Sequence, residues 1–168
     1  MNNSALLVID VQNGFITSET AHLPALIAAF LRGRHGDYAL VIATRFENAP
    51  GSLYETSMGW CEMRGPLDTA LAPEIAPLVH EVSVKHGYAP AMIDLVARLQ
   101  RADIERVDLC GIDTDQCVLA TAIALWDAGI EPRILSNLCA STGGPSAHEA
   151  GLLVARRAIG RRNVVVLA

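Results

Sequence analysis

The stretch RVDLCGIDTDQCVLATAIALWDAG, residues 106–129, decides the fold class, because an apolar strand pattern gives way within it to a helical pattern. Its first part, RVDLCG, is a short apolar run typical of a strand buried on both faces of a parallel sheet. Its second part has helical spacing and ends at Gly129, and its apolar face consists of Val118, Ala122, Leu125 and Trp126. A strand followed by a helix is therefore predicted here.

The same alternation continues along the chain. Short apolar runs predict strands at residues 5–10, 38–44, 81–84, 131–136 and 163–168. Helical patterns lie between them at residues 22–34, 90–99 and 146–160, and Ser146 with Glu149 forms a predicted capping box for the last helix. This order predicts a single three-layer α/β domain over residues 1–168, with a mostly parallel sheet and right-handed crossovers.

Composition excludes several classes of function. The chain has 168 residues, of which 51% are hydrophobic, and its formal net charge is −5 with no basic run, so no nucleic-acid or membrane partner is expected. Small neutral or cationic ligands remain open. Residues 1–10 lack a secretion signal and no apolar segment approaches the ~20 residues of a membrane span, so a cytoplasmic protein is expected. The four cysteines have no C-x-x-C spacing, which predicts reduced thiols.

Polar residues lie at the carboxyl ends of the predicted strands. Asp10 ends the first strand, Lys85 ends the third, and Cys117 opens the helix after the fourth. Ligands of open parallel sheets bind beyond this edge, so we expect the three residues to face one site. Each alone is more simply a loop carboxylate, a solvated lysine or a small buried thiol. Together they predict a nucleophile, because a helix start favours thiolate, a carboxylate could take the thiol proton and an ammonium could hold that carboxylate.

Other sequence motifs give weaker evidence about function. The chain has no G-x-S-x-G, G-x-x-x-x-G-K-[ST] or H-E-x-x-H motif and no G-x-G-x-x-G after the first strand, which counts against serine esterases, nucleotide hydrolases and dinucleotide enzymes. Residues 141–151 could offer N–H groups to an anion, although an ordinary loop before a capped helix is the favoured interpretation. Residues 45–78 form an irregular stretch typical of a lid or binding wall. Cys110 is predicted to be a packing residue, and Cys61 and Cys139 loop or core thiols.

Three segments resemble the signature segments of the isochorismatase-like cysteine hydrolases. They are LLVIDVQNGF at residues 6–15, VSVKHGY at residues 82–88 and GIDTDQCVLATAIALWDAGIEPRIL at residues 111–135. The resemblance implies a six-stranded parallel sheet of order 3-2-1-4-5-6 and a catalytic triad of Asp10, Lys85 and Cys117. In that order the first and fourth strands are neighbours, so Asp10 and Cys117 fall together while Lys85 reaches across from the outer third strand.

The resemblance also implies a mechanism. The Cys117 thiolate attacks a carbonyl carbon, Asp10 acts as base and then as acid, Lys85 supports both by its charge, and water hydrolyses the thioester. A catalytic thiolate of this kind is expected to have a pKa well below the free value of about 8.5. The family also implies a cis peptide bond between Ile112 and Asp113, and an oxyanion hole formed by the backbone N–H groups of Asp113 and Cys117. Family members associate, so a homodimer or higher homo-oligomer is expected.

Departures from the family pattern bear on the substrate. Nicotinamidases carry an Asp-x-His and a further His after the second strand that bind a divalent metal, whereas no histidine lies between His35 and His80 here. We therefore expect no metal and no other cofactor, and nicotinamide is disfavoured as substrate. Residues 88–91 read YAPA where many relatives have YSAF, and Asn137 with Leu138 replaces the common Asp-Ala. These changes predict a differently shaped pocket.

Three hypotheses about function follow. The leading one is metal-independent hydrolysis of a small amide, ureido or carbamoyl compound, because the retained Cys117 favours C–N cleavage. One alternative is hydrolysis of an isochorismate-like vinyl ether with Asp10 as the acid, since some isochorismatases lack the cysteine. The other is a catalytically silent binding or assembly member. The candidates for substrate-binding walls are aromatic residues on or near strand-end loops, which core or dimer contacts also explain, namely Phe15, Phe46, Trp60 and Tyr88.

Overall fold

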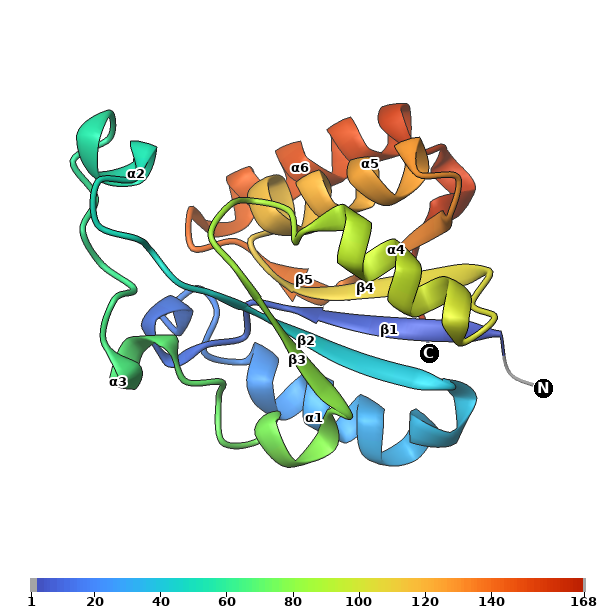
Figure 1. Ribbon diagram of the computed structural model, residues 1–168. Helices are drawn as coiled ribbons and strands as arrows, with labels where there is room; N and C mark the ends of the chain where they lie inside the picture. Colours follow the sequence, from blue (N-terminus) through green and yellow to red (C-terminus); the bar gives the residue numbers. More distant parts are fainter. Residues whose placement is uncertain (1–2, 168) are drawn as a thin grey trace.

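The computed structural model describes residues 3–167, and within them six strands form one sheet (Figure 1). The order is β3-β2-β1-β4-β5-β6, and every neighbouring pair is parallel. The strands are β1 (Ser4–Ile9), β2 (Leu40–Phe46), β3 (Glu81–Lys85), β4 (Arg106–Ile112), β5 (Glu131–Ala140) and β6 (Val164–Val165). The predicted α/β fold class and strand order are confirmed.

Helices cover both faces of this sheet. The helix α1 (Leu23–Arg34) lies on one face, and α4 (Met92–Arg101), α5 (Leu119–Asp127) and α6 (Gly144–Ala158) lie on the other (Figure 1). Every residue of β1 is buried as a result, which explains why its sequence is a continuous apolar run. Short 3-10 turns complete the backbone at Asn13–Phe15, His35–Asp37, Ala76–Leu78 and Arg161–Asn163. Within residues 3–167, no helix combines the length and apolar character that a membrane span requires.

Several predicted element boundaries are wrong. Helix α6 begins at Gly144 with Gly143 as its N-cap, so Ser146 and Glu149 form no capping box. Pro145 occupies the first turn of α6, where its fixed backbone angle suits a helix start. Strand β5 continues four residues past the predicted end at residue 136, to Ala140, whereas β6 is limited to Val164–Val165. The last predicted strand residue, 168, lies outside the described residues.

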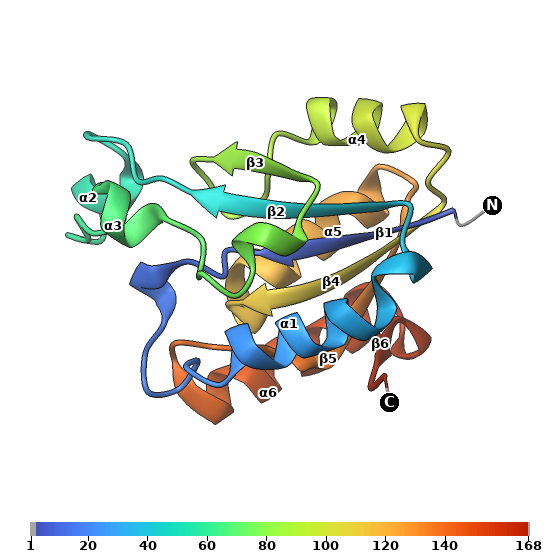
Figure 2. The same ribbon diagram turned by 90° about the horizontal axis from the view of Figure 1, so that it is seen from below.

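An excursion between β2 and β3 carries the chain beyond the carboxyl ends of the strands. It contains two short helices, α2 (Leu53–Thr56) and α3 (Pro66–Thr69), which both lie past that edge of the sheet (Figures 1 and 2). The fully buried Gln12 fastens the excursion, because its side-chain amide donates to the carbonyl oxygens of Phe46 and Thr69, each at 2.9 Å. The excursion therefore forms a wall beside the edge where the candidate residues lie.

Gly111 brings the ends of β1 and β4 together. Its φ is +121°, and a Cβ atom on this residue would lie 2.1 Å from the carbonyl oxygen of Ile9 on β1. Only glycine permits this approach. One residue further on, the Ile112–Asp113 peptide bond is cis, at the position where the family resemblance places such a bond. The close pairing sets the start of the helical segment after β4 directly beside the end of β1.

Candidate active site

Asp10, Lys85 and Cys117 meet at the carboxyl edge of the sheet. Lys85 Nζ lies 2.7 Å from Asp10 Oδ2 and donates a hydrogen bond to Cys117 Sγ at 3.3 Å. Asp10 is fully buried, Lys85 is 3% exposed and Cys117 is partly exposed. The three side chains singled out by their strand-end positions thus meet, with the lysine in contact with both the carboxylate and the thiol.

Thr44 at the end of β2 holds Asp10 in place. Asp10 has a left-handed backbone conformation, with φ of 48°, and its N–H donates to Thr44 Oγ1 at 3.1 Å. The same hydroxyl donates to Asp10 Oδ1 at 2.6 Å, which occupies that oxygen. Within residues 3–167 no group makes a well-aligned hydrogen bond to the other oxygen, Oδ2, although the Lys85 ammonium lies beside it. Oδ2 is therefore the oxygen that is open to a proton.

The Lys85 ammonium is fixed by the turn that follows β3. It donates to the carbonyl oxygens of Gly87 at 2.8 Å and Tyr88 at 2.9 Å, and it lies 5.2 Å from the ring centroid of Phe46. An ammonium has three N–H bonds, so the two carbonyls leave one to serve Asp10 and Cys117. This geometry directs a single donor at the carboxylate and the sulfur.

Cys117 lies in a π-helical turn, Thr114–Val118, and not in an ordinary first turn of α5. The Val118 N–H donates across this turn to the Asp113 carbonyl at 3.0 Å. Such π turns are frequent at functional sites. Helix α6 supports the turn from behind, since His148 Nδ1 lies 2.8 Å from the Thr114 hydroxyl.

The expected low pKa of Cys117 is wrong. Burial, followed by the charge of Asp10, raises the pKa of the Cys117 thiol to about 12, while the Lys85 charge opposes this rise. The expectation considered only the helix start, and the loss of water around the sulfur outweighs that effect. The thiol therefore keeps its proton at neutral pH.

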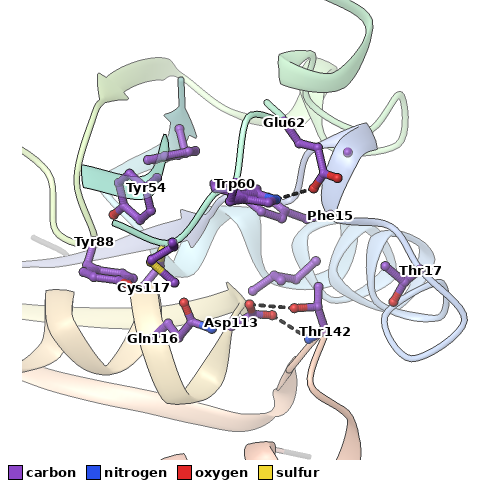
Figure 3. Close-up of a pocket in the computed structure, with 14 residues that line it drawn as sticks. Phe15, Thr17, Tyr54, Trp60, Glu62, Tyr88, Asp113, Gln116, Cys117 and Thr142 are labelled. Atoms are coloured by element: carbon purple, nitrogen blue, oxygen red, sulfur yellow. Dashed lines mark hydrogen bonds between the residues drawn. The ribbon is translucent and has the colours of Figure 1, made fainter. Parts of the chain in front are cut away.

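A cavity of about 370 Å³ opens beside Cys117. The four aromatic residues predicted as pocket walls line it, namely Phe15, Phe46, Trp60 and Tyr88. Sequence reasoning missed other side chains that also line it, including Tyr54, Met58, Glu62, Gln116 and Thr142. Figure 3 shows Phe15 and Trp60 on one side of this space, Asp113, Gln116 and Thr142 on the opposite side, and Cys117 at one end with Tyr54 and Tyr88.

The aromatic rings of the cavity form a connected group. Trp60 is stacked against Phe15 at 6.2 Å and against Phe46 at 5.9 Å between ring centroids. Tyr54 meets Tyr88 edge-on at 5.4 Å, and burial raises the pKa of Tyr54, so its phenol stays protonated. The Trp60 indole N–H donates to the Glu62 carboxylate. Each ring is held by its neighbours, which gives the wall a defined shape.

Two further residues of the site, Thr44 and Tyr54, differ in how well the sequence predicts them. Thr44 is a polar residue at the end of a predicted strand, so the rule that found Asp10 and Lys85 also applies to it. Tyr54 comes from the irregular excursion and has no comparable signal. Asp113 was assigned only a backbone role, whereas its carboxylate also accepts hydrogen bonds from the N–H and hydroxyl of Thr142, at 2.6 and 2.8 Å.

A comparison with protein families settles the relationship of this chain. The model of the isochorismatase domain matches residues 4–165. The chain belongs to the isochorismatase family. The predicted family resemblance and the predicted isochorismatase-like hydrolase are thus confirmed. No curated protein sequence matches the chain.

Solved structures of isochorismatase-family proteins share the fold. An isochorismatase-like hydrolase from Alkaliphilus metalliredigens has a TM-score of 0.82 and 24% identity, over 98% of this chain and 94% of that one. The nicotinamidase of Bacillus subtilis has a TM-score of 0.81 and 22% identity, over 94% of this chain and 97% of that one. The pyrazinamidase of Pyrococcus horikoshii, in complex with zinc, has a TM-score of 0.80 and 19% identity, over 98% of each chain.

The donor set of this isochorismatase-family chain does not fit a zinc centre. Across residues 3–167, no three His, Cys, Asp or Glu side chains are grouped so that they could hold a metal ion. The polar residues of the cavity are instead carboxylates, an amide and hydroxyls spread over its walls.

Proposed function

We propose that this isochorismatase-family hydrolase cleaves the C–N bond of a small amide, ureido or carbamoyl compound through a thioester on Cys117. The observation that carries the proposal is the position of Lys85 Nζ, 2.7 Å from Asp10 Oδ2 and 3.3 Å from Cys117 Sγ, beside an open cavity. The nicotinamidases and pyrazinamidases among the structures of similar fold act on amides, which supports the same bond type.

The first half-reaction moves one proton and forms one bond. Cys117 Sγ attacks the substrate carbonyl carbon while its proton passes to Asp10 Oδ2. Because the pKa of the thiol is raised to about 12, this transfer accompanies the attack and does not precede it. The backbone N–H groups of Asp113 and Cys117, two residues that line the cavity, are the proposed donors to the tetrahedral oxyanion.

The second half-reaction restores the enzyme. The tetrahedral intermediate collapses, the C–N bond breaks, and the leaving nitrogen takes the proton from Asp10. Water then attacks the thioester carbonyl carbon with Asp10 as its base, and the released sulfur regains a proton. Lys85 keeps its charge throughout and stabilises whichever partner, carboxylate or sulfur, is negative.

The cavity disfavours the alternative substrate, an isochorismate-like vinyl ether. Isochorismate carries two carboxylates, whereas the described residues that line the cavity include Glu62 and Asp113 and no lysine, arginine or histidine.

A silent binding subunit is also disfavoured. Burial of the Asp10–Lys85 pair costs desolvation free energy, which a binding subunit would have no reason to bear. The buried pair also lies beside the Cys117 thiol at one end of an open cavity, as a reaction would require.

The remaining expectations stay predictions. They are a small-molecule substrate with no nucleic-acid or membrane partner, a homodimer or higher homo-oligomer, a cytoplasmic location and a single domain over residues 1–168. Phe15, Phe46, Trp60 and Tyr88 are proposed as substrate-binding walls on the basis of their place in the cavity.

Replacement of the nucleophile tests the proposed function. Cys117→Ala and Cys117→Ser should abolish ammonia release from a panel of small amides and ureas, and should abolish iodoacetamide labelling at position 117 as read by peptide mass. Cys61→Ser is the matched control, because Cys61 is exposed and does not line the cavity. A folded Cys117→Ala protein that still releases ammonia at the wild-type rate would contradict the thioester on Cys117, whereas hydrolysis of isochorismate itself by that variant would point to vinyl ether cleavage. The absence of turnover of any amide by the folded wild-type protein would point to a silent member.

A further inference from the structure

The Asp113 carboxylate lies at the cavity without a counter-ion. It is 8% exposed, it lines the cavity, and its two oxygens accept hydrogen bonds from the N–H and hydroxyl of Thr142. No ion pair joins it to another side chain of residues 3–167. Burial raises its pKa, while the hydrogen bonds from Thr142 oppose that rise. Buried charges in proteins are usually paired, so this one calls for a partner from outside the chain.

The side of the cavity facing Asp113 is aromatic. Phe15 and Trp60 lie opposite Asp113 across the space in Figure 3. A cation near an aromatic ring face is attracted by the ring electrons, most strongly for tryptophan. The Trp60 indole N–H also donates to Glu62, a second carboxylate of the lining, which adds negative charge on this side.

The cavity has no positive charge of its own to balance these groups. The described residues that line it contain two carboxylates, Glu62 and Asp113, and no lysine, arginine or histidine. Lys85 lies beyond Cys117, where it is paired with Asp10 and bonded to two backbone carbonyls. A substrate with an anionic tail would meet only like charge, and a neutral tail would leave Asp113 uncompensated.

We propose that the substrate of this cavity carries a compact organic cation, held between the Phe15–Trp60 side and the Asp113 carboxylate, with its amide carbonyl at Cys117. The inference rests on the proposed function and names the substrate class for the same site. Quaternary ammonium and protonated amine groups share the required chemistry. The aromatic side excludes water from the cation, and Asp113 supplies the opposite charge.

Binding to an inactive variant tests the cation preference without any turnover. Betaine amide and 3,3-dimethylbutanamide have the same shape and differ in one positive charge. Both are titrated into a Cys117→Ala, Trp126→Phe protein, in which Trp60 is the single tryptophan and reports binding by its fluorescence. We expect betaine amide to bind about tenfold more tightly than the neutral amide. Equal affinity of the two compounds would overturn the proposal.

A substitution at Asp113 locates the preference. Asp113→Asn keeps the shape and an acceptor for the Thr142 N–H but removes the charge, so it should reduce the affinity ratio of the two amides to about twofold or less. The affinity for 3,3-dimethylbutanamide should stay within about twofold, which controls for damage to the cavity. Asp127→Asn, at the far end of α5, is the matched control and should leave the ratio unchanged. An unchanged ratio in Asp113→Asn would overturn the role of Asp113.

The two proposals fail in different ways. If the wild-type protein releases ammonia from the neutral and cationic amides equally well, and binds them equally, the cysteine mechanism stands and the cation proposal falls. If no amide is turned over but the inactive variant still prefers betaine amide, the cation site stands and the proposed reaction falls.

Discussion

The Lys85 ammonium and the Asp10 carboxylate lie 2.7 Å apart, and each side chain is only 1% exposed. Removing two charges from water so completely costs free energy, which close pairing and further hydrogen bonds recover. Thr44 bonds one side of this pair and the carbonyls of Gly87 and Tyr88 bond the other. Removal of either charge alone should therefore affect stability as well as activity.

The Lys85→Met variant should be both inactive and destabilised. The substitution leaves Asp10 charged and unpaired in the interior, which typically costs about 3–5 kcal/mol. We expect a loss of this size in the free energy of unfolding, measured by urea denaturation at pH 7, and no detectable ammonia release. The double variant Asp10→Asn, Lys85→Met should recover most of the stability and none of the activity. A double variant no more stable than Lys85→Met would contradict the ion-pair explanation.

The Asp10→Asn variant should separate thiol ionisation from turnover. The Asp10 charge raises the pKa of Cys117, so its removal lowers that pKa while Lys85 still favours the thiolate. Thiolate should then form at a less alkaline pH than in the wild type, which the ultraviolet absorbance of the thiolate measures during a pH titration. Turnover should nevertheless fall by about 10²–10⁴-fold, because the general base is lost. A thiol titrating at higher pH than in the wild type would contradict the assigned direction.

Thr44 should act as a positioning residue for Asp10. Thr44→Val keeps the side-chain shape but removes the hydroxyl that occupies Oδ1 and accepts from the Asp10 N–H. Hydrogen bonds to charged groups contribute about 1.5–3 kcal/mol, so kcat should fall by about 10–100-fold with little change in KM. Thr44→Ser retains the hydroxyl and should recover most of kcat. If the Ser variant is as slow as the Val variant, packing and not hydrogen bonding explains the residue.

Gly151 should be required for the contact between α6 and the π turn. A Cβ atom there would lie 2.7 Å from the backbone N and Cα of Asp115. Gly151→Ala should therefore lower the free energy of unfolding by about 1–3 kcal/mol. Because the substitution displaces the π turn, it should also slow the alkylation of Cys117 by iodoacetamide. Gly33→Ala in α1 is the matched control, since that position has open space, and it should be neutral or slightly stabilising. Equal stability of the two variants would contradict the close packing.

The fold and the shared location of the three candidate residues could be predicted because both depend on short-range patterns. Apolar runs mark buried parallel strands, and parallel strands in one sheet end at a shared edge, so Asp10, Lys85 and Cys117 were expected at the same edge. The alternation of strands and helices set the layers. The strand order came from the family resemblance, whose cysteine segment lies between two strands of the sheet, and the structure confirms it.

The path of the excursion, the cavity wall and the pKa of Cys117 depend on tertiary packing, which leaves no periodic pattern in the sequence. The path of the excursion is fixed by long-range hydrogen bonds such as that from Gln12 to the Thr69 carbonyl, so Tyr54 and Glu62 could not be placed in the cavity. Asp108 lies inside an apolar strand, and only the fold reveals the bidentate Arg133 that accompanies it. The pKa of Cys117 was predicted in the wrong direction because its depth of burial was unknown.

The excursion between β2 and β3 builds one wall of the cavity from a single segment of the chain. Asp10 directly follows β1, Lys85 ends β3 and Cys117 lies in the π turn. In contrast, one uninterrupted segment provides Tyr54, Met58, Trp60 and Glu62. The part of the cavity wall that the excursion provides is therefore encoded apart from Asp10, Lys85 and Cys117, and apart from Phe15 and Asp113. A laboratory selection confined to residues 47–80 would vary that wall while Asp10, Lys85 and Cys117 stay unchanged.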